Sequence, residues 1–408
     1  VTTKVSKHEA TQRMGRAGRV ASGSCYKFWS RAEEGSLPLS PPAEMEIADL
    51  SSLALELALW GTEVDQLAFL STPNARRLRK ARDLLRMLGA LGHGDKITKH
   101  GKALAALPLH PRLGHMLLSA GKKSAELAAL LSERDPLPRH APSDFLLRVE
   151  LLEDKERFTS RFSYQINAET FERIQDQSRR LKLAAPESDS NMTKAQMLAL
   201  AYPDRIGKRR KGQKNRFLLS GGIGAFFVSH DPLAKNSFIV VAELEGKKKE
   251  SGIRRAISIT EAEIRDLFSS ELRSELSCKW SKRENRVISK REEKLGAISL
   301  TSNAWTDVPE AKVSMALVEG IREIGLYLSE NERNFLYRLS AAGEPYSSFT
   351  VDRLMDTLED WLLPYLSGIT TAKEWKSFDK SLALRGILSY RETQILNQKV
   401  PETFMTPL

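Results

Sequence analysis

The hydrophobic pattern of this 408-residue chain changes its period near Arg216, and that change constrains the fold more than any other feature. Before it, apolar residues recur every three or four positions, which is the spacing of an amphipathic helix. After it come short runs rich in β-branched and aromatic residues, separated by turns that contain Gly and Lys. These runs are 217–220, 225–228, 238–244 and 254–259. Several short strands with such turns predict a small β-barrel, and residues 287–288 and 297–300 are candidates to extend it.

The first strongly periodic segments predict a winged-helix module. Residues 50–60 carry one apolar stripe that ends at Gly61, and residues 78–88 carry a second. Residues 92–97 then predict a turn and a short strand, after which Thr98 can cap the next helix. Helices followed by a short β wing are the elements of a winged helix.

The middle and the end of the chain are predicted to be helical. From residue 104 to about residue 202 the pattern is typical of a helical bundle, with Pro111 suited to the first turn of a helix. Ser143 is expected to cap another helix of this bundle. After Pro309 the apolar positions of 313–324 and 354–361 predict further helices. Residues 24–29 predict a short strand near the start of the chain.

Composition excludes several classes of protein. The chain has 63 Lys and Arg against 52 Asp and Glu, and this net charge of +11 suggests a polyanionic partner. Cys25 and Cys278 lie far apart without Cys/His ligand spacing, so neither a disulfide scaffold nor a metal site is expected. No apolar run approaches the ~18–20 residues that span a bilayer. We therefore expect a cytoplasmic protein with no membrane partner.

The strongest chemical signal lies in residues 12–19, Gln-Arg-Met-Gly-Arg-Ala-Gly-Arg. The arginines Arg13, Arg16 and Arg19 recur at spacing three, which brings them to one side of a helical or tightly turned segment. A guanidinium is always charged and binds phosphate oxygens bidentately. Such a group suits phosphoryl transfer, in which an arginine finger neutralises charge on the γ-phosphate. The alternative is an Arg-rich surface loop that contacts nucleic acid or nothing.

This string resembles motif VI of superfamily 2 helicases, QRxGRxGR, in its DEAH/RHA form. Later segments resemble the same family, and bacterial HrpB-type ATP-dependent helicases in particular. These segments are 49–57, 60–61, 88–91, 97–98, 107–113, 128–134, 201–206, 222–225, 361–365 and 383–388. The resemblance covers nearly the whole chain, and motif VI is its most specific part.

The resemblance implies roles for the residues of the motif. Arg16 and Arg19 match its arginine fingers and are the candidate catalytic residues, and with Gln12 they are the candidate nucleotide-binding residues. The remaining motif positions are implied to be structural: Arg13, Gly15 and Gly18. In the full-length protein the family's cofactors are ATP and Mg²⁺. The implied partners are the upstream RecA-like domains of the same polypeptide and single-stranded nucleic acid, RNA more than DNA.

The resemblance also implies a multidomain, mainly α-helical fold. Its parts are the end of a second RecA-like α/β domain (1–36), a winged helix (37–103), a helical ratchet bundle (104–204), an OB-like β-barrel (205–305) and a mainly helical C-terminal region (306–408).

Two motifs that a helicase needs are missing from the sequence. No GK[ST] P-loop is present, and no DExH carboxylate motif. The family places both before motif VI, and the chain does not begin with Met. We therefore expect a piece of a longer protein, one that neither binds a nucleotide stably nor hydrolyses ATP by itself.

A second basic signal stands at the start of the predicted barrel. Residues 205–216 contain seven basic residues in twelve positions and no acid. They are the candidate nucleic-acid-binding residues: Arg205, Lys208, Arg209, Arg210, Lys211, Lys214 and Arg216. Positive charges of this density suit backbone binding, and nearby aromatic residues could stack on bases. The alternative is a solvated basic loop beside aromatic residues of the barrel core. The aromatic residues are Tyr202, Phe217, Phe226 and Phe227.

Three weaker signals have ordinary structural explanations. Residues 221–224, Gly-Gly-Ile-Gly, predict a tight hairpin rather than a phosphate loop. Residues 247–249, three lysines, predict a polar hairpin tip. The basic face of residues 76–86 suits either RNA or a RecA-like domain. Two further functions stay open: a truncated, non-enzymatic nucleic-acid-binding module, and a protein-interaction scaffold.

Overall fold

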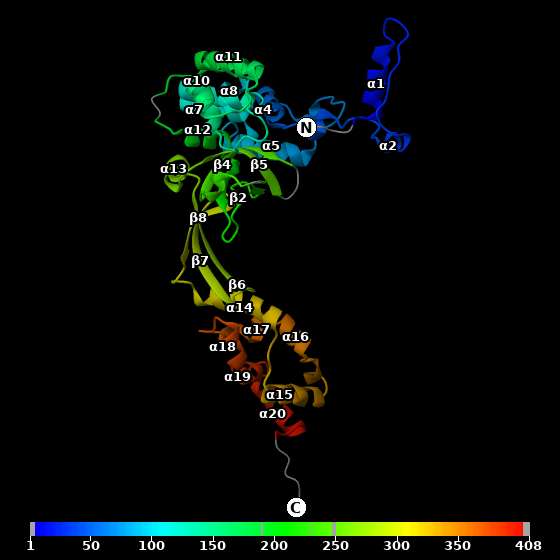
Figure 1. Ribbon diagram of the computed structural model, residues 1–408. Helices are drawn as coiled ribbons and strands as arrows, with labels where there is room; N and C mark the ends of the chain where they lie inside the picture. Colours follow the sequence, from blue (N-terminus) through cyan, green and yellow to red (C-terminus); the bar gives the residue numbers. More distant parts are fainter. Residues whose placement is uncertain (1–4, 189–190, 229, 247–249, 403–408) are drawn as a thin grey trace, which may run out of the picture. The chain divides into compact units, whose positions relative to one another are not determined.

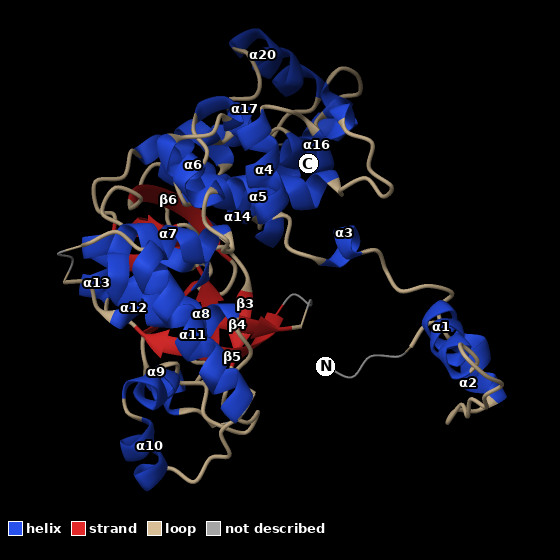
Figure 2. Cartoon of the chain, turned by 90° about the horizontal axis from the view of Figure 1, so that it is seen from above, coloured by secondary structure: helices blue, strands red, loops and turns tan. Residues whose placement is uncertain are grey.

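The computed structural model describes residues 5–188, 191–228, 230–246 and 250–402. The chain divides into two compact units, residues 1–267 (unit 1) and residues 268–408 (unit 2). Unit 1 contains helices and a closed β-barrel, whereas unit 2 contains a three-stranded sheet followed by helices (Figures 1 and 2). The lysines at 247–249 lie outside the described residues.

The first part of unit 1 is helical and contains no strand among its described residues. It comprises α1 (Lys7–Ala17), α2 (Arg31–Ser36) and α3 (Glu44–Ile47). The predicted strand at 24–29 is wrong, because this segment has no regular structure. Tyr26 is 79% exposed and Phe28 is 95% exposed, so the described chain offers these apolar side chains no sheet on which to pack.

Three helices of unit 1 lie where the sequence predicts a winged helix, and the short strand predicted at 92–97 is reduced to an isolated β-bridge between Leu91 and Ile97. The helices are α4 (Ser51–Trp60), α5 (Ala75–Met87) and α6 (Lys99–Ala105), with a small core that includes Leu57, Leu85 and Leu104. Gly61 ends α4 in the left-handed conformation, at φ +71°. The Thr98 hydroxyl accepts a hydrogen bond from the Gly101 amide at 2.9 Å, so the predicted N-cap is confirmed.

The bundle of unit 1 follows directly. Its helices are α7 (Pro111–Ala120), α8 (Ala125–Ser132), α9 (Leu146–Glu153), α10 (Lys155–Arg161), α11 (Ala168–Ala184) and α12 (Lys194–Ala201). Pro111 occupies the first turn of α7, as predicted. Ser143 does not cap α9, because the Leu146 amide donates to Asp144 instead. Ser143 bonds to the barrel instead. Its amide donates to Asp231 at 3.0 Å, and its carbonyl accepts from the Ala256 amide at 2.9 Å.

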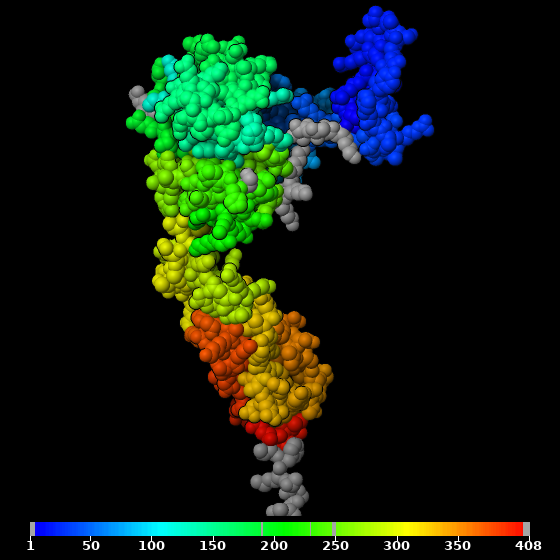
Figure 3. Space-filling model, in the orientation of Figure 1, coloured from blue at the N-terminus to red at the C-terminus, as the bar shows by residue number. Residues whose placement is uncertain are grey.

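Five strands close the predicted β-barrel. They are β1 (Ile206–Arg209), β2 (Arg216–Leu219), β3 (Gly224–Phe226), β4 (Phe238–Glu245) and β5 (Glu250–Ser258). Their order is β1-β2-β3-β5-β4, with β4 pairing back onto β1 and β3 running parallel to β5. The bundle and the barrel pack against each other in unit 1 (Figure 3). Helix α13 (Glu261–Leu267) ends unit 1.

Unit 2 begins with a separate antiparallel sheet. Its strands are β6 (Arg273–Ser281), β7 (Arg286–Leu295) and β8 (Ile298–Ala304). The expectation that 287–288 and 297–300 extend the barrel is therefore wrong, because the barrel closes on itself with β1 to β5. The helices that follow are α14 (Glu310–Ile324), α15 (Glu330–Ala341), α16 (Val351–Asp356), α17 (Leu358–Trp361), α18 (Ala372–Ser377), α19 (Ser381–Arg385) and α20 (Tyr390–Lys399).

A buried ion pair joins the bundle to the start of the barrel. Arg112 on α7 is only 6% exposed, and its two terminal nitrogens donate to the Asp204 carboxylate at 2.6 and 2.9 Å. It also donates to the carbonyl of Ala201 at 3.0 Å. Burial alone would raise the pKa of Asp204, but the hydrogen bonds from Arg112 hold that pKa below its ordinary value. Asp204 precedes β1, so this pair fixes where the barrel strands begin.

Replacing Arg112 with Met should destabilise unit 1 by about 3–5 kcal/mol, because it leaves the Asp204 carboxylate without its buried cation. Adding Asp204→Asn should restore part of this loss, because the uncompensated charge is then gone. Urea unfolding followed by circular dichroism measures both. The exposed Arg179→Met is the control and should change stability by less than about 0.5 kcal/mol. Equal losses in the Arg112 and Arg179 variants would contradict the prediction.

A half-buried pair of histidines makes the stability of the fold sensitive to acid. His100 Nε2 and His115 Nδ1 lie 2.8 Å apart, and burial, followed by the charge of His100, lowers the pKa of His115 to about 4. The unfolded chain takes up this proton near pH 6.5 and the folded chain only near pH 4, so stability falls as the pH drops between these values.

When the pH falls from 7.5 to 5, protonation of His115 in the unfolded chain should lower the free energy of unfolding by about 2 kcal/mol. His115→Gln should lose correspondingly less stability over that range, as measured by urea unfolding at the two pH values. The exposed His93→Gln is the matched control and should behave like the wild-type chain. A His115→Gln variant with an undiminished acid response would disprove the assignment.

Candidate nucleotide and nucleic-acid sites

The motif at residues 12–19 lies on α1 and just beyond it. The Glu9 amide donates to the Ser6 hydroxyl and the Ser6 amide donates back to Glu9, a capping box that starts the helix. The Lys7 amide also donates to the Pro38 carbonyl at 2.9 Å and ties α1 to the following segment. Helix α1 ends at Ala17, so the last arginine of the motif lies outside it.

The helix brings together part of the predicted arginine group. Arg13 and Arg16 are three residues apart on α1 and share one face, and Gln12 lies four residues before Arg16. Arg19 follows the cap residue Gly18, so helical spacing does not fix its side chain beside the other two. All four motif side chains are exposed. Within the described ranges, Gln12, Arg16 and Arg19 have no side-chain hydrogen bond or ion pair.

The two motif glycines also face open space. A methyl group added at Gly15 or Gly18 would meet no atom within 4 Å. These glycines would let another backbone approach closely, but no described part of this chain does so. The exposed guanidiniums fit a phosphate-bearing ligand that other residues hold. No group of His, Cys, Asp or Glu in the described part of the chain could bind a metal ion.

The structure divides the basic stretch at 205–216 into three sets. Arg209, Lys211 and Lys214 are exposed on the β1–β2 hairpin and have no ion-pair partner among the described residues. Arg210 and Arg216 both pair with Glu250 of β5, at 3.3 and 2.9 Å. The remaining two, Arg205 and Lys208, lie against aromatic rings.

Arg205 belongs to the joint between bundle and barrel. Its guanidinium lies 4.8 Å from the centroid of the Tyr202 ring, and Arg112 lies 5.2 Å from the same centroid. Arg205 also donates to the Ala242 carbonyl at 3.0 Å, and burial lowers its pKa. Lys208 lies 5.6 Å from the Phe238 ring. The structure therefore places Arg205 at the joint and leaves the hairpin as the exposed part of the basic stretch.

Most of the aromatic residues near this stretch are core residues. Phe217 and Phe227 are at most 1% exposed, and their rings meet edge to face at 5.7 Å inside the barrel. Tyr202 is buried as well, and Phe226 is the one partly exposed member of the group. Three of the four aromatic residues therefore fill the interior, and they are not available for stacking on a strand. Residues 221–224 form the expected tight turn, in which the Leu219 amide donates to the Ile223 carbonyl at 2.9 Å.

Half of the basic residues of helix α5 are engaged by contacts within the chain. Arg77 donates to the carbonyls of Met45 and Ala48, whereas Arg82 and Arg86 pair with acidic residues. The other three cations lie at positions i, i+3 and i+4 of one face and are exposed without a partner in the described chain: Arg76, Arg79 and Lys80. This face stays open to either of the two partners predicted for it.

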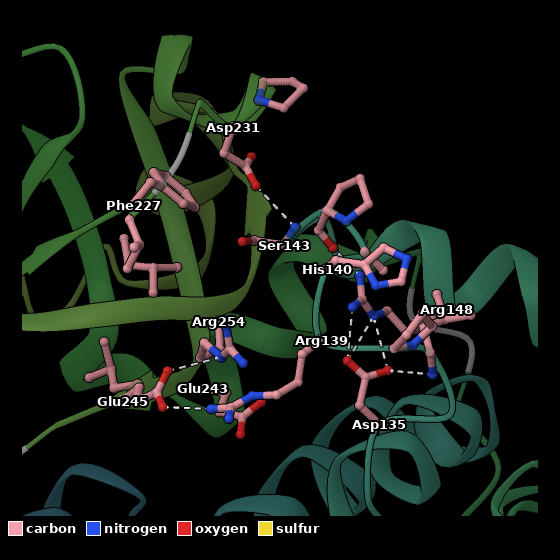
Figure 4. A pocket seen from close by; sticks show the side chains of 18 of the residues that line it. Asp135, Arg139, His140, Ser143, Arg148, Phe227, Asp231, Glu243, Glu245 and Arg254 are labelled. Carbon is pink, nitrogen blue, oxygen red and sulfur yellow. Dashed lines mark hydrogen bonds and ion pairs between the residues drawn. The ribbon is translucent and has the colours of Figure 1, made fainter. Parts of the chain in front are cut away.

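A cleft of about 620 Å³ lies between the bundle and the barrel. One wall is formed by residues 135 and 137–143 of the bundle together with Arg148 and Tyr164, and the other by residues 227–228, 230–232, 243–246 and 253–254 of the barrel. Figure 4 shows the cleft from close by. Arg139 donates to Glu245 at 2.6 Å across this cleft, and Arg254 of β5 pairs with the same carboxylate at 3.2 Å. Sequence reasoning missed this site, because its walls come from distant segments with no motif of their own.

Comparisons with known proteins agree with the sequence resemblance. No protein-family model matches the chain. The ATP-dependent RNA helicase HrpB of Escherichia coli is 30% identical over 423 aligned positions, which cover all of this chain and 50% of that protein. The probable ATP-dependent RNA helicase DHX35 of Homo sapiens is 36% identical over 123 residues, 30% of this chain and 18% of that protein.

Solved structures of E. coli HrpB are also similar to this chain. Two of them align with TM-scores of 0.59 and 0.60 at 28% and 27% identity, covering 98% of this chain and about half of theirs. The chain thus spans about half the length of the HrpB proteins it matches. The resemblance to a DEAH/RHA helicase of the HrpB type is confirmed. No helix in the described ranges is long and apolar enough to cross a membrane.

Proposed function

We propose that this chain, a homologue of HrpB, supplies the C-terminal part of an ATP-dependent RNA helicase. In the full protein, ATP hydrolysis would drive movement along a nucleic-acid strand or its unwinding. The observation that carries this proposal is the motif VI string on an exposed helix, in a chain similar to HrpB throughout its length. The domain boundaries predicted from the sequence, from the RecA-like end at 1–36 to the helical region at 306–408, are part of the proposal, except that the barrel strands end with β5 at Ser258 and not at residue 305.

Arg16 and Arg19 would act on a nucleotide that is held elsewhere in the protein. ATP supplies the γ-phosphate, and Mg²⁺ offsets part of its charge. The guanidiniums of these two residues would donate to phosphate oxygens, where negative charge increases during transfer. Gln12, four residues before Arg16, would orient a phosphate oxygen or a water molecule from the same helix face. Arg13, Gly15 and Gly18 would position the motif rather than take part in the reaction.

The barrel would hold the backbone of a single strand. Its strand order, with β3 parallel to β5, supports an OB-like assignment. OB-folds bind oligonucleotides over the face of strands 2 and 3 and with the loops that join strands 1 to 2 and 4 to 5. The exposed cations Lys211 and Lys214 lie on the first of these loops, and the exposed Arg209 is the last residue of β1 before it. They would bind phosphates, whereas Arg210 and Arg216 already share Glu250.

The distribution of charge between the units supports this location. Residues 1–267 contain 44 basic and 32 acidic residues, whereas residues 268–408 contain 19 and 20. The positive excess of the chain therefore lies entirely in unit 1, with the barrel and α5. Since backbone binding is an electrostatic effect, the nucleic acid would be held by unit 1.

A second candidate is a non-enzymatic nucleic-acid-binding module. It is favoured by the barrel cations, which need no nucleotide to bind a strand, and by a sequence without P-loop or DExH motif. A reading frame that encodes a P-loop and a DExH motif upstream of Val1 would favour the C-terminal part of a helicase. A genuine start codon at Val1 would decide for the module.

Arg19→Ala should lower RNA-stimulated ATP hydrolysis by about 10³-fold or more in the protein that carries this chain together with a P-loop and a DExH motif. Arg16→Ala should have a similar effect, because both would donate to the transferred phosphate. Steady-state ATPase assays with and without RNA measure this. The exposed Arg31→Ala is the matched control. Wild-type ATPase activity in the Arg19 variant would show that the finger assignment is incorrect.

Replacing Arg209, Lys211 and Lys214 with Gln should weaken binding of single-stranded RNA to this chain. Each lost phosphate contact lowers the slope of log affinity against log salt by about 0.7, so the triple variant should lose about 2 in slope. Fluorescence anisotropy over a salt series measures it. The matched control replaces three exposed cations of unit 2, Arg283, Lys373 and Arg391, with Gln. Equal slopes for the two triple variants would refute a hairpin that binds phosphates.

A further inference from the structure

An aromatic row leads from the core of the bundle to the cleft between bundle and barrel. Phe158 is fully buried and its ring lies 5.0 Å from Phe162, which stacks on Tyr164 at 6.0 Å and 20°. Tyr164 in turn lies 6.0 Å from His140, the exposed end of the row. Tyr164 and His140 both line the cleft, and Figure 4 labels His140 on its wall. A row of this kind holds its outer rings in place through the inner ones.

The carboxylates of the cleft are already ion-paired or hydrogen-bonded within the chain. Asp135 accepts from Arg148 at 2.8 Å, and Glu243 accepts from Arg255 at 2.8 Å. Glu245 is shared by two arginines of the cleft. Asp231 accepts hydrogen bonds from two backbone amides, those of Ser143 and Leu233, at 3.0 and 2.9 Å.

The charge of the cleft therefore selects against a phosphate. Its arginines are engaged with carboxylates, so a phosphate entering the cleft would have to displace an ion pair. A flat, neutral and polar group would meet aromatic faces together with carboxylate acceptors and guanidinium donors. A nucleobase has these properties, since its π-face stacks on aromatic side chains and its edge both donates and accepts hydrogen bonds.

The cleft is also linked to the basic hairpin. Asn215, between β1 and β2, donates from its side chain to the Phe227 carbonyl at 3.0 Å, and the Phe227 amide donates to the Asn215 carbonyl at 3.1 Å. Phe227 lines the cleft. A strand whose phosphates lay along Lys211 and Lys214 would therefore be held by a hairpin that is hydrogen-bonded to a residue of the cleft wall.

We propose that this cleft binds an unstacked nucleobase of a single RNA strand, which stacks on His140 and Tyr164 while the basic hairpin holds the backbone. This inference rests on the proposed function, because it needs an RNA strand on the barrel. It goes beyond the proposed function because it predicts that the affinity for RNA depends on the bases as well as on the phosphates. A volume of about 620 Å³ is in the range of small-molecule pockets and has room for a base with its ribose.

The test compares two fluorescently labelled oligoribonucleotides of equal length, one of adenosine and one in which every base is absent. The wild-type 408-residue chain should bind the adenosine oligomer roughly tenfold more tightly, the size expected for loss of base stacking. His140→Ala combined with Tyr164→Ala should remove this preference and leave the affinity for the abasic oligomer unchanged. Anisotropy titrations at constant salt measure all four affinities.

Controls keep the result interpretable. His93→Ala combined with Tyr390→Ala removes an exposed histidine and an exposed tyrosine elsewhere and should keep the preference. Tyr164→Phe retains the ring and should keep the preference as well, and His140→Ala alone should lower it, so the two decide the matter if the Tyr164→Ala variant does not fold.

The outcomes separate this proposal from the proposed function. Equal affinity of the wild-type chain for the two oligomers would overturn the base site and leave the helicase assignment intact. A preference that persists in the double cleft variant would overturn it too. Binding of neither oligomer would overturn the RNA-binding role proposed for the barrel, and this site with it.

Discussion

The placement of the barrel depends on the ion pair between Arg112 and Asp204. Arg112 comes from the first turn of a bundle helix, and Asp204 comes from the short segment that leads into β1. The backbone around Asp204 is fixed as well, since its carbonyl accepts from the Gly221 amide at 2.8 Å. Because a buried charge without its partner is strongly unfavourable, the bundle and the first barrel strand hold one arrangement. The hairpin and the cleft take their positions from it.

Much of the fold could be predicted because the signals are local. The Thr98 cap, the Pro111 helix start and the Gly61 stop depend on their own hydrogen bonds and backbone angles, and all three are present. The predictions that were wrong depend on distant partners. Residues 287–288 have a strand pattern, but nothing local shows that β7 pairs with β6 and β8 instead of the barrel. Ser143 has the chemistry of a cap, and it bonds to Asp231 and Ala256 instead.

The candidate sites also differ in whether their signals are local in the sequence. The motif on α1 was visible because its chemistry lies in eight consecutive residues. The basic stretch was visible as a count of charges, but the count could not tell Lys211, which is exposed, from Arg205, which packs on Tyr202. The cleft gave no sequence signal, because His140, Tyr164 and Glu245 are far apart in the chain and meet only after folding. Ion pairing decides which cations are left to bind a phosphate, and ion pairing is a property of the folded chain.

The two proposed sites also differ in how much of their own environment the chain provides. The cleft and the hairpin are built from contacts within unit 1, so their geometry exists before any ligand arrives. Arg16 and Arg19 are surrounded by water, where a unit charge interacts weakly because the dielectric constant is high and salt screens it. Their interaction with a phosphate becomes strong only where a second surface excludes that water. Strand binding can therefore belong to this chain alone, whereas the proposed arginine fingers would act only against a nucleotide that another part of the protein encloses.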